Sequence, residues 1–291
     1  MGNWDEFEKF TNVPYVQVRA DALVHFSMVE PRPERRYKKL EAKTYSGRMT
    51  DHAAMRIRKK VDLFLQISPQ RQIFNPVTGR MQPFRLGFMT LTISSRDIIT
   101  STEAVERVLK PFLRKLRKTP GLSYIWKGEL QERGQPHFHL TINQFIHHSD
   151  VRNMWNNAQT AAGYTNDYFS RHGHRNPPST EIKSVYRLAR IGAYLAKYLA
   201  KDEQSNGWVG KCWGCSDNLK TMRHFYDHPD EITMDKVQAA VDEGSARKVT
   251  YEQCTFTLHD RPVKLLSGKL GQAYAEHLGK KVSAKKSPEK T

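Results

Sequence analysis

Two histidines and a glutamate could hold a metal ion together, because their spacing places all three on one surface. The segment Glu129-Leu-Gln-Glu-Arg-Gly-Gln-Pro-His-Phe-His139 predicts two short strands joined by a tight turn. Side chains alternate along a strand, so His137 and His139 share one face, and Glu129 lies on the matching face of the preceding strand. Two neutral imidazoles and a carboxylate make a three-ligand site with open positions for a divalent ion.

The register of this hairpin decides which side chains meet. Gly134 predicts the turn, since glycine adopts positive φ at no steric cost. A three-residue turn centred on Gly134 would place Glu129 opposite His139 and Gln131 opposite His137. Gln131 is therefore an alternative third ligand, and the sequence does not choose between it and Glu129.

A second chemical signal lies downstream, in Tyr194-Leu-Ala-Lys-Tyr-Leu-Ala-Lys201. Residues 188–203 predict a helix, and Tyr194 and Tyr198 lie at the edge of its apolar stripe, one turn apart. A lysine follows each tyrosine three residues later, at Lys197 and Lys201. A boundary tyrosine usually packs with its hydroxyl in water. Near a metal-bound phosphate, however, both phenols are candidate nucleophiles, and the lysines could steady the phosphate or favour the phenolate.

Together these motifs resemble the HUH endonucleases, and more narrowly the rolling-circle replication initiators (Rep proteins) of single-stranded DNA phages, small DNA viruses and plasmids. The features that carry the resemblance are the His-hydrophobe-His strand, an acidic residue eight positions earlier and the Tyr-x-x-Lys helix. The Glu-x-x-x-x-Gly-x-Pro-His-x-His spacing is similar to that of geminivirus Rep. The doubled Tyr-x-x-Lys resembles the two-tyrosine initiators of microvirus-type phages. Phe88-Met-Thr-Leu-Thr-Ile93 resembles the first Rep motif, and the resemblance covers residues 85–205.

The resemblance implies metal-dependent nicking and joining of single-stranded DNA at a replication origin. One tyrosine would attack a phosphate held by Mg²⁺ or Mn²⁺, leaving a 5′-phosphotyrosine link and a free 3′ hydroxyl that primes replication. The link retains the phosphodiester energy, so rejoining would need no ATP. A rolling circle needs one strand transfer to start and another to end, which would employ both Tyr194 and Tyr198.

The elements that must position these residues predict a mixed α+β domain. Strands are expected over 84–95, 123–131, 136–143 and 179–186, and helices over 101–118, 150–162 and 188–203. This order fits a central antiparallel sheet with helices packed on it, as in the ferredoxin-like or RRM-like arrangement, which the HUH resemblance also implies. Ser101 or Thr102, and Ser149 or Asp150, are expected to cap the first two helices, and Pro111 to kink or restart the first.

The rest of the chain divides by composition. A basic N-terminal extension with a helix over 51–67 and a hairpin turn at 75–79 is expected over 1–80, and the endonuclease domain over 81–205. An accessory region with a helix over 233–241 and a strand over 248–258 is expected over 206–278. Residues 279–291 predict a basic disordered tail.

The charge balance favours a polyanionic partner. The 291 residues include 47 Lys and Arg against 30 Asp and Glu, which gives a formal charge of +17 and an isoelectric point near 9.8. With 10% aromatic residues, this composition points to nucleic acid. Cationic side chains of the hairpin and of the helix over 101–118 are expected to contact DNA: Lys127, Arg133, Arg114 and Lys115.

Several protein classes do not fit the sequence. No apolar run reaches the length of a signal peptide core or a membrane span, and three cysteines make no disulfide framework, so a cytoplasmic protein of a bacterial host without membrane contact is expected. No Gly-x-x-x-x-Gly-Lys-Ser/Thr segment is present, so a helicase, like the polymerase, would come from the host.

Other functions remain compatible with these residues. The same chemistry serves transposases and conjugative relaxases, although relaxases usually present three histidines to the metal. A non-catalytic DNA- or RNA-binding protein is a further alternative, against which the complete set of Glu129, His137, His139 and both tyrosines argues.

Overall fold

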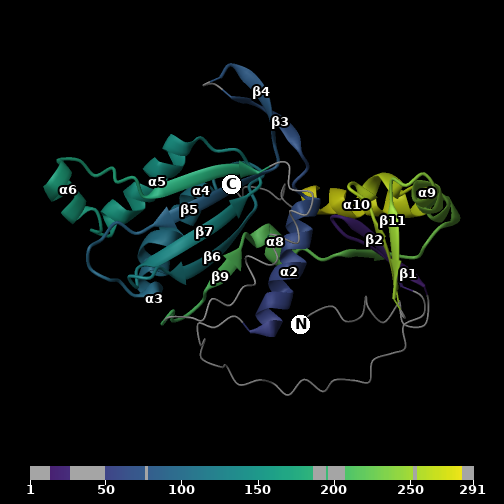
Figure 1. Cartoon of the computed structure of the whole chain (residues 1–291), viewed down its shortest axis with the longest axis horizontal. Helices are drawn as coiled ribbons and strands as arrows, with labels where there is room; N and C mark the ends of the chain where they lie inside the picture. Colours follow the sequence, from purple (N-terminus) through teal and green to yellow (C-terminus); the bar gives the residue numbers. More distant parts are fainter. Residues whose placement is uncertain are drawn as a thin grey trace, which may run out of the picture. The chain divides into compact units, whose positions relative to one another are not determined.

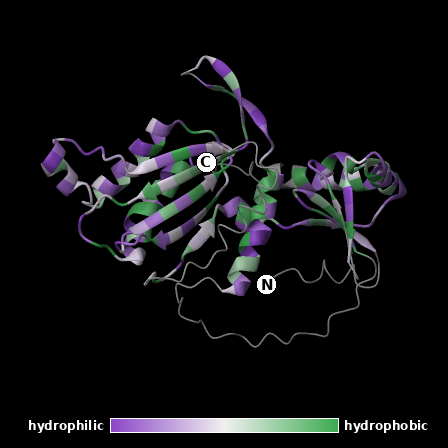
Figure 2. Cartoon of the chain, in the orientation of Figure 1, coloured by the Kyte–Doolittle hydropathy of each residue, from purple (hydrophilic) through white to green (hydrophobic). Residues whose placement is uncertain are grey.

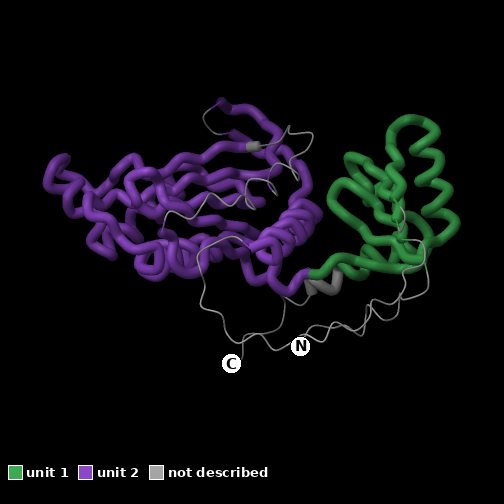
Figure 3. The backbone as a smooth tube through the Cα atoms, turned by 60° about the horizontal axis from the view of Figure 1, so that its bottom comes forward, with its two compact units in different colours: residues 1–40, 223–291 green, residues 41–222 purple. Residues whose placement is uncertain are grey.

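The computed structural model describes residues 14–26, 50–75, 78–185, 195, 207–251 and 254–283. The chain divides into two compact units, one formed by residues 41–222 and the other by residues 1–40 together with 223–291 (Figure 3). As in Figure 3, residues 41–222 are called unit 2, and residues 1–40 with 223–291 are called unit 1. Within the described ranges, no helix combines the length and the apolar character needed to cross a membrane.

Unit 2 is built on a five-stranded antiparallel sheet in the order β8-β5-β7-β6-β9 (Figure 1). The predicted α+β class with a central antiparallel sheet is confirmed. The strands are β5 (Leu86–Thr92), β6 (Tyr124–Leu130), β7 (Pro136–Ile142), β8 (Thr180–Val185) and β9 (Trp213–Cys215). The short edge strand β9, within the region expected to be accessory, was not predicted and pairs with β6.

The sheet has one apolar and one polar face, because side chains alternate along its strands (Figure 2). The apolar face packs against two helical segments, Ser101–Leu116 and α5 (His148–Ala161). Phe138 of β7 meets Trp155 of α5 with ring centroids 6.0 Å apart, and Trp155 in turn meets Phe112 at 5.4 Å. All three rings are fully buried, so this contact fixes β7 against the helices and leaves the polar face of the sheet for chemistry.

The helical segment Ser101–Leu116 accommodates Pro111 without a break. It consists of α3 (Ser101–Ala104), a π-helical turn η1 (Val105–Leu109) and α4 (Lys110–Leu116). Proline has no N–H to donate to the preceding turn, and the wider turn directly before it absorbs the interruption. The caps differ from those expected: Thr100 caps α3 and His147 caps α5, each accepting a hydrogen bond from a backbone N–H two or three residues on.

Further elements of unit 2 surround this core. The helix α2 (Asp51–Gln66) begins at Thr50, and α8 (Asp217–Thr221) lies against it: Lys60 donates to the carbonyl oxygens of Lys220 (3.1 Å) and Met222 (3.0 Å). A two-stranded ribbon, β3 (Arg71–Asn75) with β4 (Arg80–Phe84), confirms the predicted turn at 75–79. The short helix α6 (Asn166–His172) has no buried residue and was not predicted.

Unit 1 has its own antiparallel sheet, in the order β10-β1-β2-β12-β11. Its strands are β1 (Tyr15–Val18), β2 (Ala22–Phe26), β10 (Phe225–Asp227), β11 (Arg247–Thr250) and β12 (Cys254–Leu258). A core that includes Val18, Phe225 and Leu270 joins them to α9 (Glu231–Asp242), the 3-10 turn η2 (Pro262–Leu265) and α10 (Gly268–Ser283).

Unit 1 differs from the expectations at two places. The single strand predicted over 248–258 is a hairpin of β11 and β12, because the chain reverses between them. The helix α10 runs to Ser283, five residues into the segment predicted to be disordered, since its apolar positions Leu270 and Tyr274 are buried and hold its first turns in place.

Candidate metal centre

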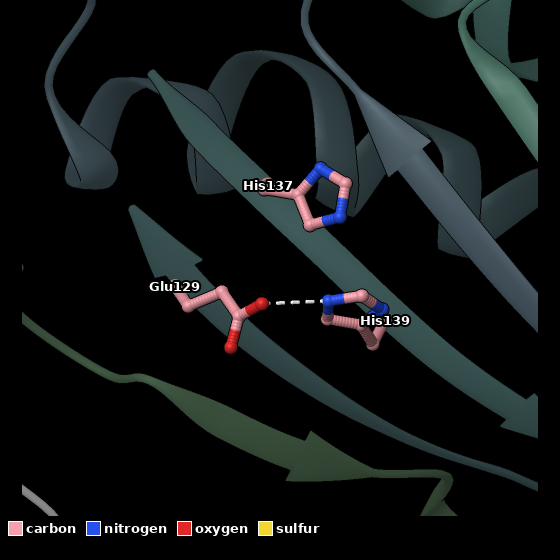
Figure 4. Close-up of side chains that lie close together, drawn as sticks. All are labelled: Glu129, His137 and His139. Carbon is pink, nitrogen blue, oxygen red and sulfur yellow. Dashed lines mark hydrogen bonds and ion pairs between the residues drawn. The ribbon is translucent and has the colours of Figure 1, made fainter. Parts of the chain in front are cut away.

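Glu129, His137 and His139 gather on the polar face of the β6–β7 hairpin (Figure 4). One ligand atom from each side chain lies within 4.8 Å of those of the other two, and all three side chains are partly buried. His139 Nε2 lies 2.7 Å from Glu129 Oε1, and the two imidazole centroids are 4.5 Å apart. Among the described residues, this is the one group of three such side chains close enough to share an ion.

The pairing of the hairpin differs from the expected register. Glu129 lies opposite His137, and Lys127 lies opposite His139. A hydrogen bond from Gln131 N to Gln135 O closes the turn, so residues 132–134 form it and its centre is Arg133, one residue before the expected centre at Gly134. Glu129 still reaches His139, because diagonal neighbours on one face of a sheet lie within reach of a long side chain.

Threonines of β5 orient both imidazoles from the neighbouring strand. Thr90 and Thr92 lie opposite His139 and His137 in the ladder, with hydroxyl oxygens 3.4 Å and 3.1 Å from the respective Nδ1 atoms. With its Nδ1 engaged in this way, His139 turns its Nε2 toward Glu129 Oε1, 2.7 Å away. Outer groups that fix the ring of a metal ligand are a general feature of histidine metal sites. The alternating threonines of β5 could be seen in the sequence. The sequence did not show that β5 lies next to β7, which is what places the threonines beside the histidines.

Gln131 lies beside His137 rather than opposite it in the ladder. Its Nε2 is 3.3 Å from His137 Nδ1, while its buried Oε1 makes no hydrogen bond to any described residue. The oxygen and nitrogen of an amide exchange places by a half rotation. In the rotated form Oε1 would accept from a protonated Nδ1, which is the form that leaves Nε2 open for a metal. This geometry favours Gln131 as a group that orients His137.

His137 is held in its neutral form. Burial, and then the adjacent His139 imidazole, lower the pKa of His137 to about 4, against a smaller raising effect of the Glu129 carboxylate. An imidazole must be unprotonated to bind a metal. At neutral pH His137 is therefore ready to act as a ligand without losing a proton.

Lys127 is the cation nearest the carboxylate. Its side chain is buried, with 4% of the residue exposed, and its Nζ lies 3.6 Å from Glu129 Oε2. This ion pair places a positive charge beside the Glu129 carboxylate. The three other residues expected to contact DNA, Arg133, Arg114 and Lys115, are exposed.

Tight packing behind the hairpin holds β6 in place. A Cβ atom added to Gly128 would lie 2.2 Å from the ring of Trp208, so the residue between Lys127 and Glu129 has no room for a side chain. Trp208 is itself buried and meets Phe138 at 5.9 Å. Sequence reasoning did not connect residue 208 with the hairpin, because no local pattern links positions that are 80 residues apart.

The predicted nucleophile helix falls almost wholly outside the described residues. Tyr194, Lys197, Tyr198 and Lys201 all lie outside them, and Leu195 alone is described. Leu195 is helical and fully buried, as its place in the predicted apolar stripe requires.

The donor set fits a divalent ion. Ligand atoms that share an ion at about 2.1 Å stand at most about 4.2 Å apart, so a small side-chain rotation would close the observed spacing. One carboxylate and two imidazoles suit Mn²⁺ well, whereas Mg²⁺ prefers oxygen ligands alone. Glu129, His137 and His139 could therefore hold such an ion.

Comparison with known proteins gives one match. Residues 87–203 match the family described as "Replication-associated protein ORF2/G2P", a stretch that contains the strands of the metal centre and the Tyr-x-x-Lys segment. This match supports a replication initiator of the Rep type. Neither the curated proteins nor the solved structures yield a match to this chain.

Proposed function

We propose that the chain initiates rolling-circle replication by nicking and rejoining single-stranded DNA through a tyrosine. The observation that carries this proposal is the convergence of Glu129, His137 and His139 across β6 and β7, inside the stretch that matches a replication-associated family. The family match alone supports replication initiation and a DNA partner. The metal cluster and the paired tyrosines add the chemistry.

The residues divide the work as follows. Glu129, His137 and His139 hold Mn²⁺ or Mg²⁺, which when bound would neutralise charge on a phosphate and orient it for in-line attack. Tyr194 or Tyr198 attacks through its phenolic oxygen. The new bond joins that oxygen to phosphorus, the bond from phosphorus to the 3′ oxygen breaks, and the phenol proton is transferred in net terms to the released 3′ hydroxyl.

The reverse reaction rejoins the strand. The phosphotyrosine link conserves one phosphodiester for the one broken, so a 3′ hydroxyl can attack it without another energy source. Lys197 and Lys201, each three residues after a tyrosine, could contact the phosphate during both transfers. The host would then supply helicase and polymerase.

A covalent adduct is the direct test. Single-stranded oligonucleotides that tile the replicon encoding the chain, labelled at the 3′ end, are incubated with the protein and Mn²⁺ and resolved under denaturing conditions. We expect a labelled protein–DNA band from one oligonucleotide, absent with chelator and absent with His137→Ala. Cleavage without any adduct would indicate a hydrolytic nuclease, and DNA binding without cleavage would revive the non-catalytic alternative.

A further inference from the structure

The β3–β4 ribbon projects from unit 2 and belongs to neither five-stranded sheet (Figure 1). Arg71 to Asn75 pairs with Arg80 to Phe84 in a continuous antiparallel register. The connecting turn is closed by a hydrogen bond from Gly79 N to Asn75 O, and Gly79 has a φ of +65°. An isolated two-stranded hairpin is only marginally stable, so the base of the ribbon requires anchoring.

One face of the ribbon provides that anchor. Arg71 Nη2 donates to Asn143 O at 3.1 Å and to Gln144 Oε1 at 2.6 Å. The Arg71 guanidinium also lies 5.4 Å from the ring centroid of Phe84, which meets Phe145 edge-on at 5.8 Å. These contacts hold the root of the ribbon against the segment that follows β7.

The opposite face is exposed and largely apolar. Phe74 and Met81 lie directly opposite each other in the ladder, and each keeps 59% of its surface in solvent. A single exposed apolar residue is ordinary, but here two large ones form a cross-strand pair far along a projecting ribbon. Such a pair gives the ribbon little packing within the described chain and is suited to contact with another molecule.

The charge around this pair selects the kind of partner. Residues 71–85 contain three arginines and no aspartate or glutamate. Arg71 and Arg85 are hydrogen-bonded at the root of the ribbon, and Arg80 lies at its outer end. Arg80 is exposed and pairs with Asn75, so its side chain belongs to the other face from Met81 and flanks the apolar pair at the outer end of the ribbon. A basic ribbon with an apolar pair suits a polyanion that also offers apolar surface, which describes the stacked bases and phosphates of DNA.

The shape of the element favours double-stranded DNA. A two-stranded β-ribbon fits into a groove of the duplex, and apolar side chains carried by such elements insert between base steps. We infer that the face of the ribbon carrying Phe74 and Met81 binds duplex DNA adjoining the single-stranded nicking site, with Arg80 on a phosphate and the apolar pair against bases. This inference rests on the proposed function for the identity of DNA as the partner.

Binding measurements in EDTA test the inference apart from any cleavage. One probe is a fluorescent duplex two helical turns long with a single-stranded tail, and the other is the tail alone. Phe74→Ala/Met81→Ala should bind the tailed duplex about tenfold more weakly, since the variant lacks the side chains that would stack on or insert between bases. Its affinity for the tail alone should be unchanged. The control Met55→Ala removes an exposed methionine of α2 in the same unit and should leave both affinities unchanged.

A spectroscopic readout distinguishes base contact from a general loss of affinity. Duplexes carrying 2-aminopurine at successive steps near the junction should brighten when the wild-type ribbon unstacks a base, and the double variant should abolish the increase. Arg80→Gln should retain the increase and reduce the salt dependence of duplex binding by about one phosphate contact. Because both replaced side chains are exposed, thermal unfolding should show the double variant folded.

Three results would overturn the inference. The double variant could bind the tailed duplex like wild type, lose affinity for the tail equally, or abolish self-association seen in sedimentation, which would make this face a contact between copies. Failure of the proposed function looks different: duplex binding that depends on the ribbon, with no covalent adduct from any oligonucleotide. An adduct combined with duplex binding independent of the ribbon would refute the ribbon's role alone.

Discussion

The β6–β7 hairpin and the β3–β4 ribbon are both antiparallel pairs within unit 2, yet their surroundings differ. Neighbouring strands flank β6 and β7 on both sides, Trp208 covers one face, and the imidazoles on the other are oriented by threonines. The ribbon is anchored at its root and exposes Phe74 and Met81. A site for a small ion requires side chains fixed to within fractions of an ångström, whereas an element that meets a long polymer requires reach.

The largest effect should come from the metal ligands. His137→Ala or His139→Ala should reduce nicking to below about one hundredth of wild type, because altering a metal centre even outside its ligands costs ten- to hundredfold. Affinity for single-stranded DNA, measured by the fluorescence anisotropy of a labelled strand, should stay near wild type. The ribbon variant Phe74→Ala/Met81→Ala should instead cleave a single strand normally and lose affinity only for the tailed duplex. Nicking that survives excess chelator would contradict the assignment.

The tyrosines test whether the centre serves one nucleophile or two. Tyr194→Phe and Tyr198→Phe should each leave part of the nicking activity, and the double variant should leave none, since neither remaining side chain can form the covalent link. Gel assays of cleavage and of strand transfer measure both steps. If one single variant is inactive and the other matches wild type in both assays, the tyrosine replaced in the wild-type-like variant is not a nucleophile.

Matched glycine substitutions compare the backbones of the two hairpins. Gly128→Ala should cost about 1–3 kcal/mol of folding stability, because its Cβ would meet the buried Trp208 ring, and should lower nicking by shifting Glu129. Gly79→Ala should cost about 1 kcal/mol from its positive φ alone, since no atom lies within 4 Å of its Cβ position. Its nicking should be unchanged. Urea unfolding measures the stability loss of each variant. Equal losses for Gly128→Ala and Gly79→Ala would show that the two hairpins are packed alike.

Stability should also depend on pH through His137. The pKa of His137 is about 4 in the folded chain and about 6.5 for an exposed imidazole. As pH falls below 6.5, the unfolded chain takes up a proton that the folded chain refuses until near pH 4, so stability decreases. Between pH 7 and pH 5 the loss is about 1–2 kcal/mol.

Urea unfolding in EDTA at both pH values should show a smaller loss for His137→Gln than for wild type. The ribbon supplies the control, since the described residues of β3 and β4 include no aspartate, glutamate or histidine. Phe74→Ala/Met81→Ala should therefore keep the wild-type loss. An unaltered loss in His137→Gln would assign the pH dependence to other groups.

The same contrast explains what the sequence could predict. The face shared by His137 and His139 follows from strand alternation. The α+β class was predicted from the order of strands and helices, and the structure confirms it. The predicted register was wrong because the position of the turn depends on distant contacts: Gln135, at the end of the turn, donates to the carbonyl oxygens of Ser95 and Asp97. The contacts of Thr90 and Thr92 with the imidazoles likewise depend on strand order.

Elements without a strong local period escaped prediction. The ribbon was anticipated at its turn alone, since β3 and β4 bury little surface and carry only a short alternation. Strand β9 has three residues, too few for any pattern, and its position depends on pairing with β6. The sheet of unit 1 joins β2 to β12, whose partners lie more than 200 residues apart, which no sequence window can detect.

That long-range pairing affects how the chain folds as it is synthesised. Strands β1 and β2 are made first, but their neighbours β10 and β12 follow only after all of unit 2 has been translated. Although β1 and β2 can pair with each other, at about 5–20 residues per second their outer edges wait roughly 10–40 s for a partner strand. Unit 2 can fold on the ribosome during that interval, while unit 1 cannot close before the last segment emerges. A circular permutant that makes the five strands of unit 1 contiguous would remove the delay and lower the aggregation of nascent chains.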